Sequence, residues 1–140
     1  MKKSILILLA IILLIGLFNS CSHASFDSEG SASYYIYNGC TETITIVALT
    51  NQGNSSKTIE KTVSPSETVK LMDDSGIGIN PAPEYSFSNI YAKDSSGTVI
   101  YLQNPVNNQA WIKKAHNSGN RDYYHTDYTL QIFLQKQYDL

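Results

Sequence analysis

The sequence predicts an all-β protein, an immunoglobulin-like β-sandwich of about seven strands that follows a helical signal peptide. Short runs of β-branched and aromatic residues recur along the chain, and clusters of turn residues separate them. After the leader, no window places its apolar residues at the spacing of a helical stripe. A small open β-barrel is the alternative, because it produces the same pattern of short strands.

The expected strands begin at Tyr34. The clearest is 43–49, in which five of seven residues are β-branched. In chain order the expected strands are 34–37, 43–49, 58–63, 68–72, 85–92, 98–102 and 128–134. Turns are expected at Asn38-Gly39, 51–56, 64–67 and 94–97. Residues 73–84 contain two glycines and two prolines, so we expect an irregular connection there.

Residues 1–20 have the features of a signal peptide. Lys2 and Lys3 precede an uncharged apolar run from Ile5 to Phe18. A helix that spans a bilayer needs about 20 apolar residues, whereas the core of a signal peptide needs roughly 7–15. The run therefore predicts export.

Cys21 directly follows this run, between Ser20 and Ser22. The arrangement resembles the lipobox of bacterial lipoproteins, in which a signal peptidase cuts before a cysteine that carries diacylglycerol. Ser20 matches that pattern, whereas Phe18 and Asn19 depart from it, as in the relaxed lipoboxes of Bacteroidota-type and spirochaete-type envelopes. The resemblance implies that the mature chain begins at Cys21 and is held on a membrane by palmitate-type acyl chains.

Two other fates of the leader stay open. Ser22-His23-Ala24 fits the small-x-small rule for ordinary signal peptidase, and cleavage there would discard Cys21. An uncleaved signal anchor is the third alternative. Lipidation would hold the protein on the membrane. Each methylene buried in the bilayer contributes about 0.8 kcal/mol to the free energy of membrane binding, and two or more acyl chains anchor a protein stably.

The mature chain has the size of one domain. Removal of residues 1–20 leaves 120 of the 140 residues. Residues 21–33 comprise the lipidated cysteine and a tether rich in Ser, Ala and Gly, and 34–140 form the sandwich domain. Loss of Lys2 and Lys3 reduces the ten basic residues to eight, against twelve acidic ones. This balance excludes nucleic acid as the expected partner, because such affinity depends on neutralising phosphates.

Cys40 is the second cysteine of the chain. If Cys21 is acylated, the two cannot form a disulfide, so we expect Cys40 to be a buried thiol that packs as a small hydrophobe.

The mature chain as a whole resembles small cell-envelope lipoproteins of Bacteroidota-type bacteria. The likeness comprises the lipobox, an aromatic first strand, the Ser-Pro-Ser-Glu turn at 64–67, Trp111, and the final Asp-Tyr-Thr-Leu-Gln-Ile strand at 127–132. It implies a sandwich domain in the cell envelope, expected at the outer membrane, and it implies no activity.

Catalytic and metal motifs are incomplete. Asp74-Ser75-Gly76 has the form of an aspartic-protease strand, but that chemistry needs two carboxylates and no second copy follows. His125 and Asp127 share one strand face, yet a zinc site needs three or four ligands. We therefore predict no enzyme, no metal and no cofactor. A small envelope hydrolase or protease-like enzyme is the alternative, and converging carboxylates or histidines in a cleft would distinguish it.

The predicted function is a lipid-anchored binding or structural module for a glycan or protein ligand. Sandwich domains bind through end loops or one sheet face, and two irregular segments, 73–85 and 111–124, have suitable neighbours. The ten tyrosines of the chain offer rigid aromatic faces with polar tips. Trp111 also fits a core position, as tryptophan is usually buried. The candidate binding residues are Trp111, Lys113, His116, Arg121, Tyr123 and Tyr124.

Overall fold

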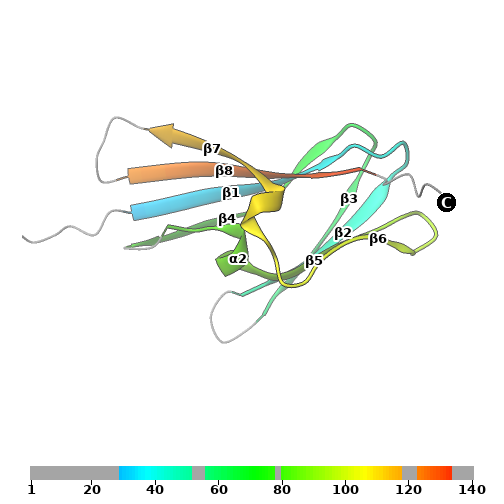
Figure 1. Cartoon of the computed structure of the whole chain (residues 1–140), viewed down its shortest axis with the longest axis horizontal. Coiled ribbons are helices and arrows are strands. Elements are labelled where there is room, and N and C mark those ends of the chain that lie inside the picture. Colours follow the sequence, from blue (N-terminus) through cyan, green and yellow to red (C-terminus); the bar gives the residue numbers. More distant parts are fainter. Residues whose placement is uncertain (1–28, 52–55, 78–79, 118–122, 134–140) are drawn as a thin grey trace, which may run out of the picture.

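The computed structural model describes residues 29–51, 56–77, 80–117 and 123–133. They form eight strands, a short helix and a 3-10 turn (Figure 1). In chain order these elements are β1 (Glu29–Asn38), β2 (Ile44–Thr50), β3 (Thr58–Val63), β4 (Thr68–Ile77), α2 (Pro83–Ser86), β5 (Phe87–Lys93), β6 (Val99–Gln103), η1 (Asn108–Ala110), β7 (Trp111–Asn117) and β8 (Tyr123–Ile132).

The strands make two four-stranded sheets. Sheet A has the order β4-β1-β8-β7, and sheet B has the order β3-β2-β5-β6. The first strand, β1, lies at the centre of sheet A, antiparallel to β4 and parallel to the last strand, β8. This arrangement confirms the predicted all-β sandwich, with eight strands where about seven were expected.

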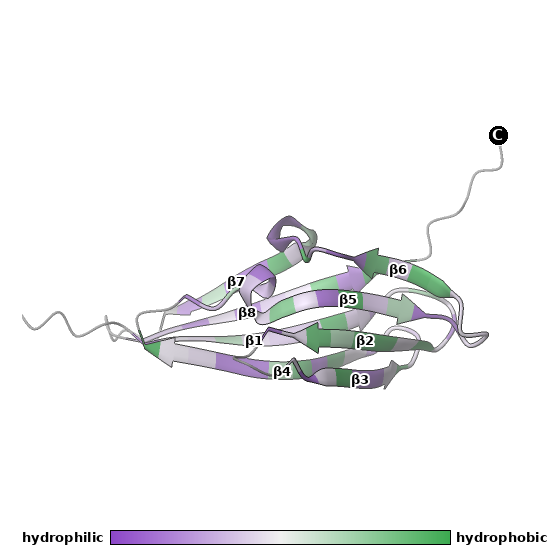
Figure 2. Cartoon of the chain, turned by 90° about the horizontal axis from the view of Figure 1, so that it is seen from below, coloured by the Kyte–Doolittle hydropathy of each residue, from purple (hydrophilic) through white to green (hydrophobic). Residues whose placement is uncertain are grey.

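The hydrophobic core lies between the sheets. Strand alternation turns Ile36, Leu130 and Ile132 of sheet A inward against Ile46 and Ile90 of sheet B, and all five are almost completely buried. Figure 2 shows hydrophobic residues along β2 and β6, whereas β3 and β4 are more hydrophilic.

An aromatic cluster closes the core next to α2. The ring of Tyr34 packs edge-on against Phe87 at 5.0 Å and against Trp111 at 6.0 Å, and stacks on Tyr128 at 5.6 Å. Such pairs contribute about 0.5–1.5 kcal/mol each beyond their area burial. The hydroxyl of Tyr34 lies 2.7 Å from Oγ of Ser86, which ties the short helix to sheet A.

Sheet A is longer than sheet B, so one end of it projects beyond the sandwich (Figures 1 and 2). We call this part the free end, comprising residues 29–33, 73–77, 113–117 and 123–127. It contains most of the segments that the sequence assigned wrongly to tether or loop.

Four boundaries differ from the sequence prediction for one reason. The domain begins at Glu29 instead of residue 34, and 73–77 continue β4 instead of forming an irregular connection. The Trp111–Asn117 strand occupies part of the segment 111–124 that was expected to be irregular, and β8 begins at Tyr123 instead of 128. These segments are rich in small and polar residues, and pairing with neighbouring strands makes them extended.

The two predicted hairpins form, and the turns at 64–67 and 94–97 are confirmed, whereas no tight turn forms at Asn38-Gly39. β2 pairs with β3 and β5 pairs with β6, both antiparallel. Gly97 adopts a φ of 85° in the second hairpin, a conformation in which an L side chain is strained. The turn at 64–67 leads from sheet B to sheet A and is closed by a hydrogen bond from Glu67 N to Ser64 O.

Asn38 ends β1 without a hairpin, because the chain crosses to the other sheet there. Its fully buried amide donates to the carbonyls of Glu42 and Val63 and accepts from the backbone amide of Cys40. Cys40 is buried as predicted, with its Sγ 3.7 Å from the carbonyl oxygen of Ile132.

The signal peptide, Cys21 and the first part of the predicted tether, residues 21–28, lie outside the described residues. Among the residues that the structure describes, no helix has the length and apolarity needed to cross a membrane.

Candidate functional site

The inner side of the free end contains a hollow of about 300 Å³. Its lining comes from three strands of sheet A and from the segment before α2. The lining residues are Gly30, Asn80, Lys113, Ala115, His116, Tyr124, His125 and Thr126. Small residues at Gly30 and Ala115 leave this space because no larger side chain fills it, and sheet B does not reach this part of sheet A (Figure 1).

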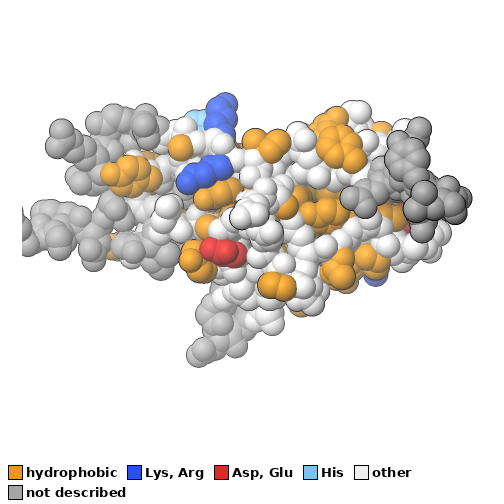
Figure 3. All heavy atoms as spheres, viewed as in Figure 1, with side chains coloured by type: hydrophobic (Ala, Val, Ile, Leu, Met, Phe, Trp, Pro, Cys, Tyr) orange, Lys and Arg blue, Asp and Glu red, His pale blue; other side chains and the backbone are white. Residues whose placement is uncertain are grey.

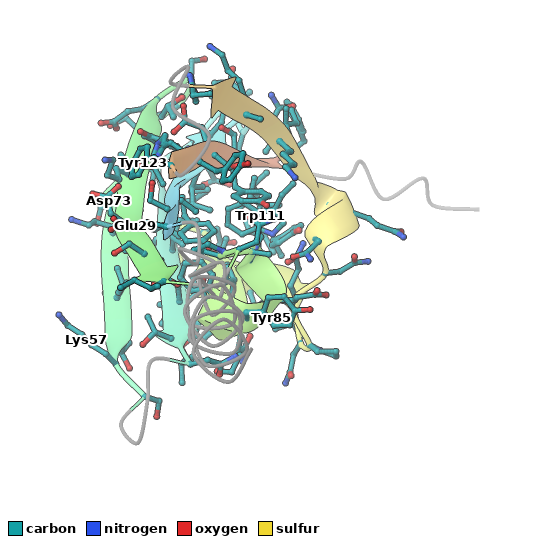
Figure 4. All side chains as sticks on the ribbon, turned by 90° about the vertical axis from the view of Figure 1, so that its left-hand side faces the viewer. Glu29, Lys57, Asp73, Tyr85, Trp111 and Tyr123 are labelled. Atoms are coloured by element: carbon teal, nitrogen blue, oxygen red, sulfur yellow. The ribbon has the colours of Figure 1, made fainter. Side chains whose placement is uncertain are left out.

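The structure brings together part of the predicted binding set. Lys113, His116 and Tyr124 line the hollow, and Tyr123 lies on the adjoining outer face, where its hydroxyl is 2.9 Å from Ser31 Oγ. Trp111 is only 5% exposed, so its assignment as a binding residue was wrong and its role in the core holds. Viewed from the free end, Trp111 lies between the sheets, whereas Glu29 and Tyr123 lie at the beginnings of β1 and β8 (Figure 4). Arg121 falls outside the described residues.

Basic and histidine side chains gather at the β7 side of this end, whereas exposed hydrophobic side chains are scattered over the rest of that face (Figure 3). Lys113 supplies a cation to the hollow, and Asn80, Thr126 and Tyr124 supply neutral polar groups. The hollow can therefore bind a ligand with hydroxyl or carboxylate oxygens.

The outer side of the free end holds a polar cluster centred on Asp127. His116 of β7 and His125 of β8 face each other in the register of the antiparallel pair. Nε2 of His116 lies 2.7 Å from one oxygen of Asp127, and Nε2 of His125 lies 3.1 Å from the other. Burial alone would raise the pKa of Asp127, but the hydrogen bonds from both histidines outweigh it and hold that pKa below its ordinary value.

Two serines of β1 extend the cluster towards β4. Ser31 Oγ lies 2.7 Å from Nδ1 of His125, and Ser33 donates to Oδ1 of Asp73 at 2.5 Å. Lys70 also bonds to Oδ1 of Asp73, at 2.8 Å, and this bond is the main cause of the lowered pKa of Asp73. The cluster therefore crosses all four strands of sheet A.

The geometry gives Ser31, His125 and Asp127 the sequence of contacts found in a nucleophilic triad. A triad also needs backbone amides aimed at the developing oxyanion. Ser31 is the third residue of β1, and it is paired on both sides, with β4 and with β8. Those ladder bonds occupy the amides that an oxyanion hole would use.

Sequence reasoning missed most of this cluster because its members are spread over four strands. The alternation of His125 and Asp127 was visible, but the placement of His116 opposite His125 depends on the register of β7 against β8. Ser31 and Ser33 lay in the segment that had been assigned to the tether. Strand-like alternation in that segment, with Ala32 buried between the two serines, was the only local signal.

Comparison with known proteins gives no relative for the chain: no protein-family model matches it, and no curated sequence matches it.

Proposed function

We propose that this protein is a lipid-anchored, non-enzymatic binding module of the bacterial cell envelope, which uses the hollow at the free end of sheet A. The observation that carries the proposal is that Lys113 of β7 and Tyr124 of β8 line one hollow of about 300 Å³, which His116 also borders. That volume is at the lower limit of small-molecule sites, about 300–1,000 Å³.

Anchoring at Cys21 would keep the hollow near the membrane. Glu29, the first residue of β1, lies eight positions after Cys21, and extended chain spans at most about 3.6 Å per residue. The free end would then stay within about 30 Å of the anchored residue. The outer membrane is the expected location, and a component of the envelope is the expected ligand.

A glycan fits the hollow better than a protein surface does. An aromatic ring, an ammonium group and an amide are the groups that contact a sugar ring and orient its hydroxyls. A stable protein interface needs about 800 Å² on each side, and the hollow by itself is much smaller.

Binding is tested with a glycan array and the purified full chain in detergent. Tyr124→Ala and Lys113→Ala should each weaken the captured glycan's affinity, because both side chains line the hollow. Tyr85→Ala and Lys57→Ala are matched controls, since both residues are exposed and neither lines it. If the control variants lose affinity as much as the hollow variants, the site lies elsewhere; if only proteins are captured, the glycan assignment fails.

The anchor is tested by mass spectrometry of the membrane fraction. The parent chain should begin at an acylated Cys21, and Cys21→Ala should lose the acyl mass and leave the membrane. An unmodified N-terminus at Ser25 would contradict lipidation and would indicate cleavage after Ala24.

A small hydrolase is the second candidate, favoured by the contacts from Ser31 to His125 to Asp127. A fluorophosphonate probe reacts with an activated serine. We expect no labelling of the folded protein, because β1 offers no amide pair beside Ser31. Labelling that disappears in Ser31→Ala but persists in Ser75→Ala would favour the enzyme over the binding module.

A further inference from the structure

We propose that His116 and His125 form a two-histidine chelate for a divalent transition-metal ion, Zn²⁺ or Cu²⁺, on the outer face of the free end. The two residues are direct cross-strand partners, and their ring centroids are 5.7 Å apart. Imidazole nitrogen suits these ions, and both are strongly bound in the order of divalent metal affinities.

The Nε2 atoms of both imidazoles contact the carboxylate of Asp127. The distances of 2.7 and 3.1 Å to the two oxygens of Asp127 bring the nitrogens towards a single carboxylate. Zinc binds imidazole nitrogen at about 2.0–2.1 Å, so two ligand atoms in its tetrahedral shell are roughly 3.3 Å apart. Small side-chain rotations would let the two nitrogens share an ion in front of Asp127.

The proposed site has two protein ligands. Among the described residues, no three His, Cys, Asp or Glu side chains are arranged so as to hold a metal. A zinc site built by the protein alone needs three or four ligands, so this pair would bind the ion more weakly and leave its other positions to water or to an external ligand. Asp127 stays beside the ion, where its negative charge favours the cation and its oxygens accept hydrogen bonds from metal-bound water.

Ser31 gives His125 the support that metal-binding histidines require. Such histidines hold their second ring nitrogen in a hydrogen bond, which sets the ring orientation and the tautomer. Nδ1 of His125 lies 2.7 Å from Ser31 Oγ, so that nitrogen can carry the proton and donate it while Nε2 binds the ion. The side chains project from paired strands, and this fixes their Cβ positions before the metal arrives.

The charged residues around the proposed metal site have opposing effects on the binding of a cation. Lys114 is the register partner of Asp127 and places a cation close to the site. Asp73 lies across β1, where Lys70 already pairs with it at 2.8 Å. Asp127 is therefore the acidic group beside the histidines that Lys70 does not neutralise. Because Lys114→Ala removes a positive charge near the ion, this change should strengthen metal binding.

The test is titration of the full chain in detergent with Zn²⁺ alone, followed by calorimetry. A Cys21→Ser background, which also lacks the proposed acyl anchor, excludes the sulfur of Cys21 as a ligand. We expect one Zn²⁺ per chain and a loss of about tenfold or more in affinity for His116→Gln and for His125→Gln, since each change removes one of two ligands. His23→Gln is the matched control and should bind like the parent.

Electron paramagnetic resonance with Cu²⁺ gives an independent reading. The parent should show two coordinated imidazole nitrogens, and each single His variant should show one. Ser31→Ala should keep two nitrogens but bind about tenfold less tightly, as expected for a positioning residue.

Equal affinity in the parent, His116→Gln and His125→Gln, with all three folded by circular dichroism, would overturn the proposal. Loss of binding in His23→Gln would also overturn it, because the ion would then sit near the N-terminus. His116 and His125 also border the glycan hollow, so Tyr124→Ala and Lys113→Ala separate the two proposals: both should weaken glycan binding and leave Zn²⁺ binding unchanged.

Discussion

The free end of sheet A and the rest of the sheet, which faces sheet B and which we call the covered half, are built from the same strands but carry different side chains. In the covered half, β1 and β8 turn large side chains inward, such as Tyr34, Ile36 and Leu130. In the free end, the same inward positions carry Gly30, Ala32 and Thr126, and only Tyr124 is large. The alternation is continuous, but the residues change in size where sheet B ends (Figure 1).

This difference separates stability from binding. Large buried side chains contribute most of the hydrophobic stabilisation of the folded state, which is roughly 25 cal/mol per Å² of apolar area buried. Small inward residues bring little of it and leave the hollow open. The free end therefore depends on backbone pairing with the covered half, and its side chains remain available for ligands.

The largest effect is expected from Tyr34→Ala in the covered half. The variant removes a fully buried ring that contacts Phe87, Trp111 and Tyr128, and should lower the free energy of unfolding by about 3–5 kcal/mol. Chemical denaturation measures this. Tyr124→Ala in the free end, where the side chain is half exposed, should cost less than about 1 kcal/mol. Equal losses would contradict the division between the halves.

The next largest effect is expected from Asn38→Ala, where β1 leaves the covered half. The change deprives the buried carbonyl of Val63 and the amide of Cys40 of their partner, at about 1–3 kcal/mol for each group. We expect a total loss of about 2–4 kcal/mol by urea denaturation. Asn89→Ala is the control, because Oδ1 of Asn89 is buried with no hydrogen-bond partner. A cost as large for Asn89 would show that the hydrogen bonds of Asn38 are not the reason.

A smaller effect is expected from His116→Gln in the free end. The histidine is 42% exposed and its contact with Asp127 is solvated, so the free energy of unfolding should change by less than about 1 kcal/mol. The same variant should lose metal affinity as described above. A destabilisation of several kcal/mol would instead make His116 a structural residue.

The smallest effect is expected from Asp127→Asn, and its effect on the free energy of unfolding should depend on pH. The folded pKa of Asp127 is lowered, so its ionised form contributes stability above the unfolded pKa of about 4, and this contribution is lost as pH falls through the folded pKa. Asp127→Asn should therefore be less stable than the parent at pH 7, and the two should converge below about pH 4. Unfolding curves at pH 7 and pH 3 measure the difference; a gap that stays constant with pH would show that ionisation of Asp127 is not its source.

Local patterns predicted the covered half well and the free end poorly. Residues 43–49 and 58–63 were recognised because β-branched runs flank polar turn residues, and both hairpins formed as expected. Residues 29–33, by contrast, carry Gly, Ser and Ala, which occur in linkers as often as in strands. Their extended form depends on β4 and β8, whose pairing residues lie at least 40 positions away in the chain.

By itself, the sequence determined the all-β class, the hairpins and the turn at 64–67, because side-chain branching and turn chemistry act over a few residues. It also placed Lys113, His116 and Tyr124 in the candidate binding set. Only the tertiary structure decided that Trp111 belongs to the core and that His116 lies opposite His125. Strand register and sheet order depend on contacts between distant segments, and local composition does not encode them.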